Sequence, residues 1–312
     1  MQQTTNTILM VRPTSFRMNE QTAVNNHYQK EITDISQEDL QLKAQQEFDV
    51  FVDKLRDVGV NVVVFNATDG LDAPDSHFPN NWVSFHENGV VGLYPMFAEN
   101  RRLERREDVL FQIEDEGFKI NHIVDYRGAE DEELFLEGTG SLLLDRVNRK
   151  AYCALSQRAD EELFIEFCED FEFTPIVFTA NQTVDGNKRT PIYHTNVMMA
   201  LGETFAVICL ASIDDKKERK NVIKHLKEDN KEIIDITESQ VNNFAGNMLQ
   251  VKGKDDKLYL IMSQAAYESL TQNQINTIEK HCSILSSSLN VIEACGGGSA
   301  RCMMAEVFLP RA

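Results

Sequence analysis

Apolar and polar residues alternate along the chain in a pattern that predicts hairpins, amphipathic helices and strands in a repeating order. Residues 83–95 predict a hairpin that turns at residues 87–89, residues 101–116 a charged amphipathic helix, and residues 119–124 a short strand. The same order then returns three times. The predicted hairpin, helix and strand are 141–155, 159–171 and 175–178 in the second copy, 197–211, 214–229 and 232–236 in the third, and 248–262, 264–281 and 288–293 in the fourth.

A fifth copy is predicted to join the two ends of the chain. We expect the last strand, 303–309, to pair with the first strand, 7–12, which precedes a helix at 37–58 and a strand at 61–65. The predicted hairpins begin at residues 83, 141, 197, 248 and 303, a spacing typical of units repeated around an axis. An ordinary mixed α/β sheet with an accidental spacing is the alternative.

The chain contains no Pro/Gly/Ser-rich linker, so residues 1–312 are expected to form a single domain. Its longest irregular stretches, 66–82 and 179–193, are expected to be functional loops. A hydrophobic content of 42% and a charged content of 26% indicate a folded globular protein. The formal net charge of −19 argues against nucleic acid or an anionic membrane as partner, because such partners need clustered Lys and Arg.

The six cysteines contain no C-x-x-C pair and no zinc-ligand spacing, which indicates reduced thiols in a cytoplasmic protein. The N-terminus does not resemble a signal peptide, and no apolar run approaches the length of a membrane span. No metal-binding motif occurs, and we expect neither a metal nor another cofactor. The expected partner is a small-molecule amino-acid substrate, and a homodimer is compatible with the sequence.

A polar or reactive residue stands directly before each predicted hairpin. If the five copies surround one axis, equivalent positions point toward that axis and converge on one pocket. These pre-hairpin residues are Asn81, Glu137, His194, Asn247 and Cys302.

Cys302 follows the glycine-rich loop 296–301, where backbone and substrate can approach closely. Taken alone, a cysteine is more often a small buried hydrophobe, but we expect the neighbouring Arg301 to favour a thiolate here. A phosphate-binding loop is the other interpretation, yet the spacing of a dinucleotide fingerprint is missing and no Lys-Ser/Thr follows. A plain flexible turn also remains open.

His194 alone among the seven histidines occupies a pre-hairpin position and could transfer protons to and from a substrate. Glu137 ends the apolar run 134–136 beside glycines, so its carboxylate is either paired with a cation or held by structural hydrogen bonds. Each residue could instead be an ordinary satisfied polar group.

Three segments in this order resemble the guanidine-modifying superfamily of arginine deiminases, dimethylargininases and glycine amidinotransferases. They are Glu137-Gly138, the segment around His194, and the terminal run GGGSARCM at 296–303. The resemblance covers nearly the whole chain and implies a five-bladed α/β-propeller, the pentein fold, built from pseudo-five-fold ββαβ modules. The run FPNNW at 78–82 resembles the branch of citrulline-utilisation hydrolases and arginine-deiminase-related proteins.

The resemblance also implies roles for individual residues. Cys302 matches the family nucleophile, His194 the general acid and base, and Glu137 a carboxylate that binds the nitrogen-rich head of the substrate. Arg158 resembles the arginine that binds the substrate α-carboxylate in relatives, and Arg101 resembles a second arginine that assists it.

Two positions depart from the family pattern. Relatives that act on guanidinium carry Asp where this chain has Asn81, and arginine deiminases carry Asp where it has Asn196. Burying a guanidinium against fewer carboxylates leaves charge uncompensated, which costs several kcal/mol. Asn81 suits a neutral ureido group, so citrulline becomes the leading substrate. The alternative is that Asn81 caps a turn, Asp75 supplies the missing charge with help from Asp69 and Asp72, and arginine is the substrate.

The predicted reaction is therefore the hydrolysis of citrulline to ornithine through a covalent intermediate on Cys302. Arginine deiminase, dimethylargininase and amidinotransferase activities are alternatives, because they share the first half of the reaction. A pentein that only binds a partner is a further alternative, since a fold does not by itself imply catalysis.

Overall fold

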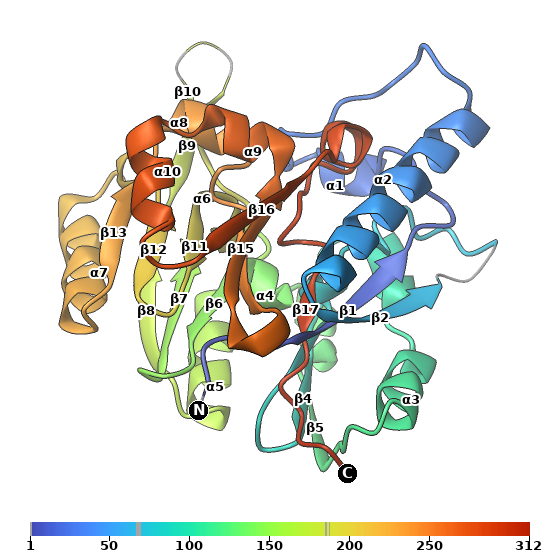
Figure 1. Ribbon diagram of the computed structural model, residues 1–312, viewed down its shortest axis with the longest axis horizontal. Helices are drawn as coiled ribbons and strands as arrows, with labels where there is room; N and C mark the ends of the chain where they lie inside the picture. The colour runs from blue at the N-terminus through green and yellow to red at the C-terminus, as the bar shows by residue number, and fades with distance from the viewer. Residues whose placement is uncertain (1, 67–69, 185, 187) are drawn as a thin grey trace.

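The computed structural model describes residues 2–66, 70–184, 186 and 188–312. Within them, three-stranded sheets of one topology recur five times: a central strand pairs antiparallel with one neighbour and parallel with the other (Figure 1). Four of them follow the chain, as predicted. They are β3 (Val83–Phe85), β4 (Val90–Leu93) and β5 (His122–Asp125); β6 (Leu142–Asp145), β7 (Lys150–Ala154) and β8 (Thr174–Phe178); β11 (Met199–Leu201), β12 (Phe205–Ile208) and β13 (Glu232–Asp235); and β14 (Leu249–Lys252), β15 (Leu258–Ser263) and β16 (Ser283–Ser287).

The fifth sheet joins the two ends of the chain, which confirms the predicted pairing. Its central strand β1 (Thr7–Arg12) runs parallel to β2 (Asn61–Asn66) and antiparallel to β17 (Ala305–Glu306), with Leu9 opposite Ala305. Strand β17 is shorter than the predicted 303–309: residues 300–303 form turns that carry Cys302, and residues 307–310 continue without regular structure.

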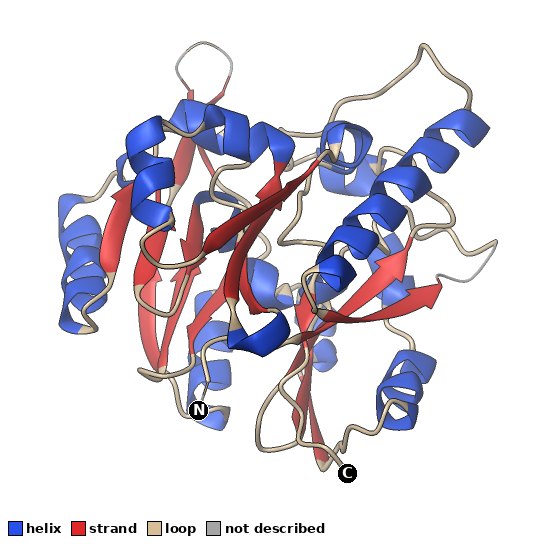
Figure 2. Cartoon of the chain, viewed as in Figure 1, coloured by secondary structure: helices blue, strands red, loops and turns tan. Residues whose placement is uncertain are grey.

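The longer helices connect the second and third strands of the sheets and lie toward the outside of the molecule (Figures 1 and 2). Helix α2 is capped by the Ser36 side chain and buries an apolar stripe with helical spacing that includes Leu40, Phe48 and Leu55. The helices are α2 (Gln37–Asp57), α3 (Glu107–Asp115), α5 (Glu161–Asp170), α7 (Lys216–Glu228), α9 (Gln264–Ser269) and α10 (Gln272–Ile278).

Short helical turns stand at the inner ends of several first strands, and Figure 1 shows α4 and α6 in the middle of the molecule. They are the η1 turn (Pro79–Asn81) before β3, α4 (Gly138–Ser141) before β6 and α6 (Thr195–Met198) before β11. The remaining short elements are α1 (Glu20–Ala23), α8 (Glu238–Val241) and the turns η2 (Glu99–Glu104), η3 (Arg127–Glu132), η4 (Leu210–Ser212), η5 (Lys254–Asp256) and η6 (Ile292–Gly296).

The predicted strand at 288–293 is wrong. The strand of this copy is β16, which pairs with β15 so that Ile284 lies opposite Leu260. Val291 and Ile292 looked like strand residues because they are apolar, but their N–H groups donate to the Glu47 carboxylate at the start of a helical turn. That turn, η6, leads directly into the glycine-rich loop before Cys302.

Two predicted helices are interrupted. The helix expected at 101–116 begins only at Glu107, because Arg101 belongs to the separate turn η2, where its guanidinium binds Glu104. The helix expected at 264–281 is divided into α9 and α10, since Thr271 forms a capping box that starts a new helix. The loop predicted at 179–193 contains a hairpin of β9 (Asn181–Val184) and β10 (Lys188–Pro191).

The apolar core is shared between neighbouring sheets. One cluster combines α2 with β1 and with Leu249, Val251 and Ile261 of the adjacent sheet, and it includes Cys302 itself. The inner ends of the first strands, where the pre-hairpin residues stand, are therefore held from several sides. No helix in the described part of the chain is long and apolar enough to cross a membrane.

Candidate active site

The structure brings the pre-hairpin residues together at the inner ends of the sheets. Each of them is at most 3% exposed. Glu137 and His194 stand at the N-termini of α4 and α6, and Asn81 lies in η1. One buried pocket is lined by Asn81, His194 and Cys302 together with Asp75, Arg101 and Arg158. Most residues predicted for the site thus line a single space, and Glu137 stands directly behind His194.

Glu137 is fully buried and holds His194 by a hydrogen bond of 2.7 Å between Glu137 Oε2 and His194 Nε2. Its other carboxylate oxygen accepts the Phe97 backbone N–H at 3.0 Å. Burial opposes ionisation, but the Arg158 guanidinium 3.5 Å away and the bond to His194 lower the pKa of Glu137 to about 2. Glu137 is therefore a carboxylate at neutral pH.

The charge on Glu137 fixes the tautomer of His194. Because a carboxylate only accepts hydrogen bonds, Nε2 carries the proton and Nδ1 is left to exchange a proton with a reacting group. Burial lowers the pKa of His194 to about 4 against the opposing effect of Glu137. The imidazole is neutral at rest, and an imidazolium that forms during a reaction is stabilised by the carboxylate behind it.

Cys302 sits in the turn after the glycine-rich loop, with two amide groups beside its sulfur. Asn247 Nδ2 lies 3.2 Å and Asn196 Nδ2 3.6 Å from Sγ. The expectation that Arg301 favours the thiolate is wrong, because its guanidinium donates to the Met304 carbonyl and to Glu306, each at 2.7 Å. Neighbours in a turn direct their side chains apart, so adjacency in sequence was misleading.

The glycine-rich loop is held closely by residues from distant parts of the chain. Gly297 has a φ of 65°, and a Cβ on it would come within 2.5 Å of Gln29 and 2.6 Å of Asn26. Its carbonyl accepts hydrogen bonds from Asn26 and from the Tyr193 hydroxyl, at 3.1 and 2.7 Å. Glycine is needed here both for the left-handed backbone and for the close approach.

Arg101 and Arg158 place two guanidinium groups around Glu137. Arg101 binds Glu104 through two hydrogen bonds of 2.9 Å and donates to Asn81 Oδ1 at 2.8 Å. Arg158 lies over the Tyr193 ring and donates to the Thr22 carbonyl and to Asn25. In this conformation, the guanidinium N–H groups of Arg158 that are expected to bind the substrate α-carboxylate already donate to Thr22 and Asn25.

Two polar atoms at the pocket have no hydrogen-bond partner among the described residues. They are Asp75 Oδ1, a free acceptor, and Asn81 Nδ2, a free donor. A Cβ placed on Gly140 would lie 2.4 Å from Asn81 Nδ2 and 2.8 Å from His194 Nδ1, so these two nitrogens are neighbours. Burial raises the pKa of Asp75, although Arg101 and bonds from Asn19 and Thr22 oppose this effect. Asp72 is exposed and binds Arg17, and Asp69 lies outside the described residues.

Residues 19–29, which we call the strap, cover the pocket and were not predicted. Asn19 and Thr22 bind Asp75, Asn25 binds Arg158, and Asn26 and Gln29 bind the glycine-rich loop. Beneath the strap the free volume is about 10 Å³, room for about one water molecule. No local pattern in residues 19–29 predicts these contacts, because their partners lie far away along the chain.

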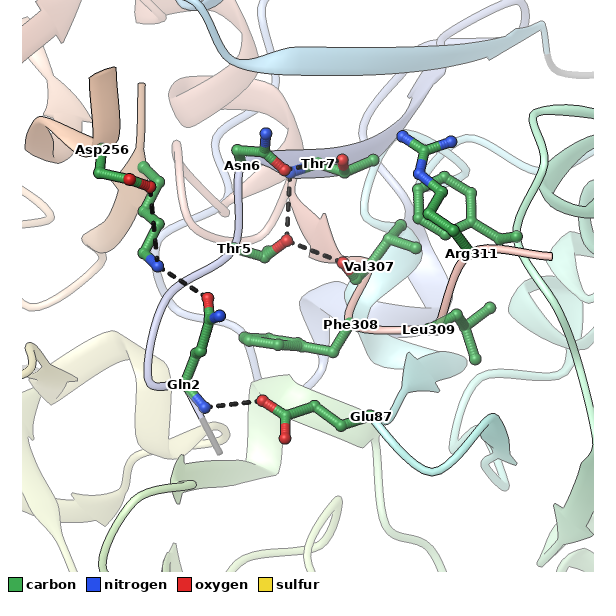
Figure 3. Close-up of a pocket in the computed structure, with 12 residues that line it drawn as sticks. Gln2, Thr5, Asn6, Thr7, Glu87, Asp256, Val307, Phe308, Leu309 and Arg311 are labelled. Atoms are coloured by element: carbon green, nitrogen blue, oxygen red, sulfur yellow. Dashed lines mark hydrogen bonds and ion pairs between the residues drawn. The ribbon is translucent and has the colours of Figure 1, made fainter. Parts of the chain in front are cut away.

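A larger cavity of about 420 Å³ is lined by residues near both chain ends, including Gln2, Thr5, Phe308 and Arg311 (Figure 3). It contains none of the residues predicted for the site. The described residues contain no group of three or more His, Cys, Asp or Glu side chains that could hold a metal ion.

Comparison with known proteins gives one family and several related folds. The model of the family described as "N,N dimethylarginine dimethylhydrolase, eukaryotic" matches residues 12–309. No curated protein matches at a significant level.

Several solved structures share the fold. ArgZ, an arginine dihydrolase from the ornithine-ammonia cycle in cyanobacteria, has a TM-score of 0.72 at 17% identity over 98% of this chain and 41% of its own. The N-terminal domain of ArgZ bound to product has a TM-score of 0.69 at 18% identity over 97% of this chain and 99% of its own. A dimethylarginine dimethylaminohydrolase variant, an adduct with S-methyl-L-thiocitrulline, has a TM-score of 0.61 at 12% identity over 96% and 98%. The chain thus spans about two fifths of full-length ArgZ.

Proposed function

The chain belongs to the N,N-dimethylarginine dimethylhydrolase family, and we propose that it is a cysteine-dependent hydrolase that cleaves a C–N bond of a ureido or guanidino amino acid. The observation that carries this proposal is the buried Glu137–His194 pair beside the pocket that holds Cys302. A nucleophile, a proton carrier and a carboxylate that orients the carrier are the parts that covalent hydrolysis needs.

In the first half of the proposed reaction, the Cys302 thiol gives its proton to His194 Nδ1, and the resulting thiolate adds to the central carbon of the ureido group. The C–N bond to the side chain of the substrate then breaks, and His194 protonates the departing amine through Nδ1. With citrulline, ornithine leaves and a carbamoyl group stays bound to the sulfur. Glu137 stabilises the imidazolium while it carries the proton.

In the second half, water replaces the amine beside His194. Nδ1 accepts a proton from the water, which attacks the carbamoyl carbon and releases the Cys302 thiolate. The product is carbamate, which decomposes to ammonia and carbon dioxide. The amides of Asn196 and Asn247 beside Sγ can donate to negative charge that develops near the sulfur in both halves.

The leading substrate is citrulline, because the free group of Asn81 is a donor. Arg101 donates to Asn81 Oδ1, which fixes the orientation of the amide and leaves its NH₂ group without a partner among the described residues. The ureido oxygen of citrulline can accept from that NH₂ group. A guanidinium carries donors alone and would leave it unpaired, which costs about 1–3 kcal/mol for a buried group.

Arginine is the second candidate, and Asp75 is the observation in its favour. Its free Oδ1 can accept a hydrogen bond from a guanidinium, or from the α-ammonium group that both amino acids carry. Both substrates would use the same nucleophile and proton carrier. Arginine would release ammonia first and citrulline after hydrolysis.

Substrate binding requires the strap to move, because the space beneath it holds about one water molecule. When the strap opens, Arg158 loses its bonds to Thr22 and Asn25 and its guanidinium becomes available to the substrate α-carboxylate. We further propose that residues 1–312 form one catalytic domain and that the five sheets close into a pentein propeller. The cytoplasmic location and the homodimer stay predictions from the sequence.

The test is to incubate the protein separately with citrulline, arginine, dimethylarginine, and arginine plus glycine. Ornithine, ammonia, citrulline and guanidinoacetate are then measured. We expect ornithine from citrulline, with no turnover in Cys302→Ala and normal turnover in Cys282→Ala, a matched loss of a thiol outside the pocket.

Each other product has a defined meaning. Citrulline formed from arginine would favour the second candidate, and guanidinoacetate would favour an amidinotransferase. If no substrate reacts and a chloroacetamidine does not label Cys302, the enzymatic proposal is overturned in favour of a binding protein.

A further inference from the structure

Among the pre-hairpin residues, Asn247 has the smallest role in the reaction proposed above. Yet its side chain contacts both the backbone N–H and the sulfur of Cys302. It lies before β14 and is 1% exposed. Its Oδ1 accepts the backbone N–H groups of Arg301 and Cys302 at 3.0 and 3.4 Å. Its Nδ2 donates to the Asn196 carbonyl at 3.1 Å and lies 3.2 Å from Cys302 Sγ.

These contacts fix the orientation of the Asn247 amide. Both groups bound to Oδ1 are backbone donors, so that atom must be the oxygen, and the atom facing Sγ must be the NH₂ nitrogen. Asn196 is less well defined, because its Nδ2 and Oδ1 lie at 3.6 and 3.9 Å from the sulfur. Asn247 is therefore the donor whose direction toward the sulfur is set by the backbone.

The side chain next to the nucleophile in sequence does not take this role. The Arg301 guanidinium is bound to Met304 and Glu306, so its charge is compensated there. Among the described residues, the side chains that bond to Sγ are the amides of Asn196 and Asn247. A thiolate accepts a hydrogen bond more strongly than a thiol does, because charge assists the bond.

We propose that Asn247 is a positioning residue for Cys302. Through Oδ1 it holds the turn that presents the nucleophile, and through Nδ2 it stabilises the negative charge on the sulfur. This inference rests on the proposed function only in taking Cys302 as the nucleophile.

The chemistry of the amide makes the inference specific. Asparagine offers an acceptor and a donor on one rigid group, and this site uses both. Asn247→Asp keeps an acceptor for the two backbone N–H groups but replaces the donor by a negative oxygen near the sulfur. Asn247→Ala removes both groups without adding charge.

The experiment measures the rate at which iodoacetamide alkylates Cys302 across a range of pH, with the modified residue identified by peptide mass spectrometry. In Asn247→Asp we expect the midpoint of the rate profile to move upward by about 1–3 pH units, because a like charge opposes the thiolate. In Asn247→Ala we expect a smaller upward shift, together with a fall in kcat for the substrate found above. Asn242→Asp adds the same charge at an exposed position and should keep the wild-type midpoint.

The outcomes separate this inference from the proposed function. If the wild-type protein turns over a substrate and its Cys302 is alkylated, but both Asn247 variants keep the wild-type midpoint, the inference is overturned and the proposed function stands. If Asn247→Asp does not fold, the midpoint of Asn247→Ala decides alone, with an unchanged midpoint again overturning the inference. Absence of both turnover and Cys302 labelling in the wild type would refute the proposed function itself.

Discussion

Replacing Glu137 by Gln removes a negative charge from a fully buried position while nearly preserving the size of the side chain. The carboxylate now accepts from His194 Nε2 at 2.7 Å and from the Phe97 N–H at 3.0 Å. A Gln amide has one oxygen and one NH₂ group, so it cannot accept from both donors. If the oxygen stays with Phe97, the NH₂ group faces His194 and requires an unprotonated Nε2.

That requirement moves the imidazole proton to Nδ1, the atom that should accept protons in the reaction. A misplaced proton removes general acid–base catalysis, which is worth about 10²–10⁴-fold in rate. In transition-state free energy this corresponds to about 3–5 kcal/mol. The same substitution leaves the buried Arg158 and Arg101 charges with less compensation, and we expect it to lower the free energy of unfolding by about 3–5 kcal/mol.

The assay compares kcat and the urea unfolding midpoint of the wild type with those of Glu137→Gln and Glu104→Gln. Glu104 is a matched control, because it is a buried carboxylate that binds Arg101 but makes no contact with His194. We expect both variants to lose stability and Glu137→Gln to lose far more activity. Equal losses of activity in the two variants, or near-wild-type kcat in Glu137→Gln, would refute the reasoning about the tautomer.

Three further predictions concern the pocket. Asn81→Asp should raise the ratio of kcat/KM for arginine to that for citrulline, because it replaces the free donor by an acceptor, and an unchanged ratio would argue against Asn81 as a specificity determinant. Gly140→Ala should lower kcat about 10²-fold, since its Cβ would press on Asn81 Nδ2 and His194 Nδ1, whereas Gly128→Ala, with open space around it, should be neutral. The free energy of unfolding should fall as pH decreases from about 6.5 to 4, because His194 binds a proton in the unfolded chain at a higher pH than in the folded one. Urea titrations of His194→Asn should show a smaller fall over this range. A fall equal to that of the wild type would contradict the lowered pKa of His194.

The repeat was predictable because each sheet is built from local elements. The hairpins join neighbouring segments, and their alternating apolar residues are visible in the sequence. The convergence of Glu137, His194 and Cys302 followed from one assumption, that equivalent positions of repeated units meet near an axis. Where apolar residues misled, as at Val291 and Ile292, a distant carboxylate from Glu47 decided the local structure.

The strap could not be predicted, because its contacts join residues far apart in the chain. Asn25 binds Arg158, 133 residues away, and Asn26 binds the Gly297 carbonyl, 271 residues away. The direction of each Asn and Arg side chain was equally hidden. Arg301 turns away from Cys302 and Asn247 turns toward it, and only the folded backbone distinguishes the two.

The most direct test of the central claim is the mass of the intact protein when its reaction with citrulline is stopped by acid during turnover. We expect a fraction of the protein to be heavier by one carbamoyl group, with that group on Cys302 after digestion, and no such species in Cys302→Ala. Steady formation of ornithine by Cys302→Ala would contradict the role of Cys302 as the nucleophile.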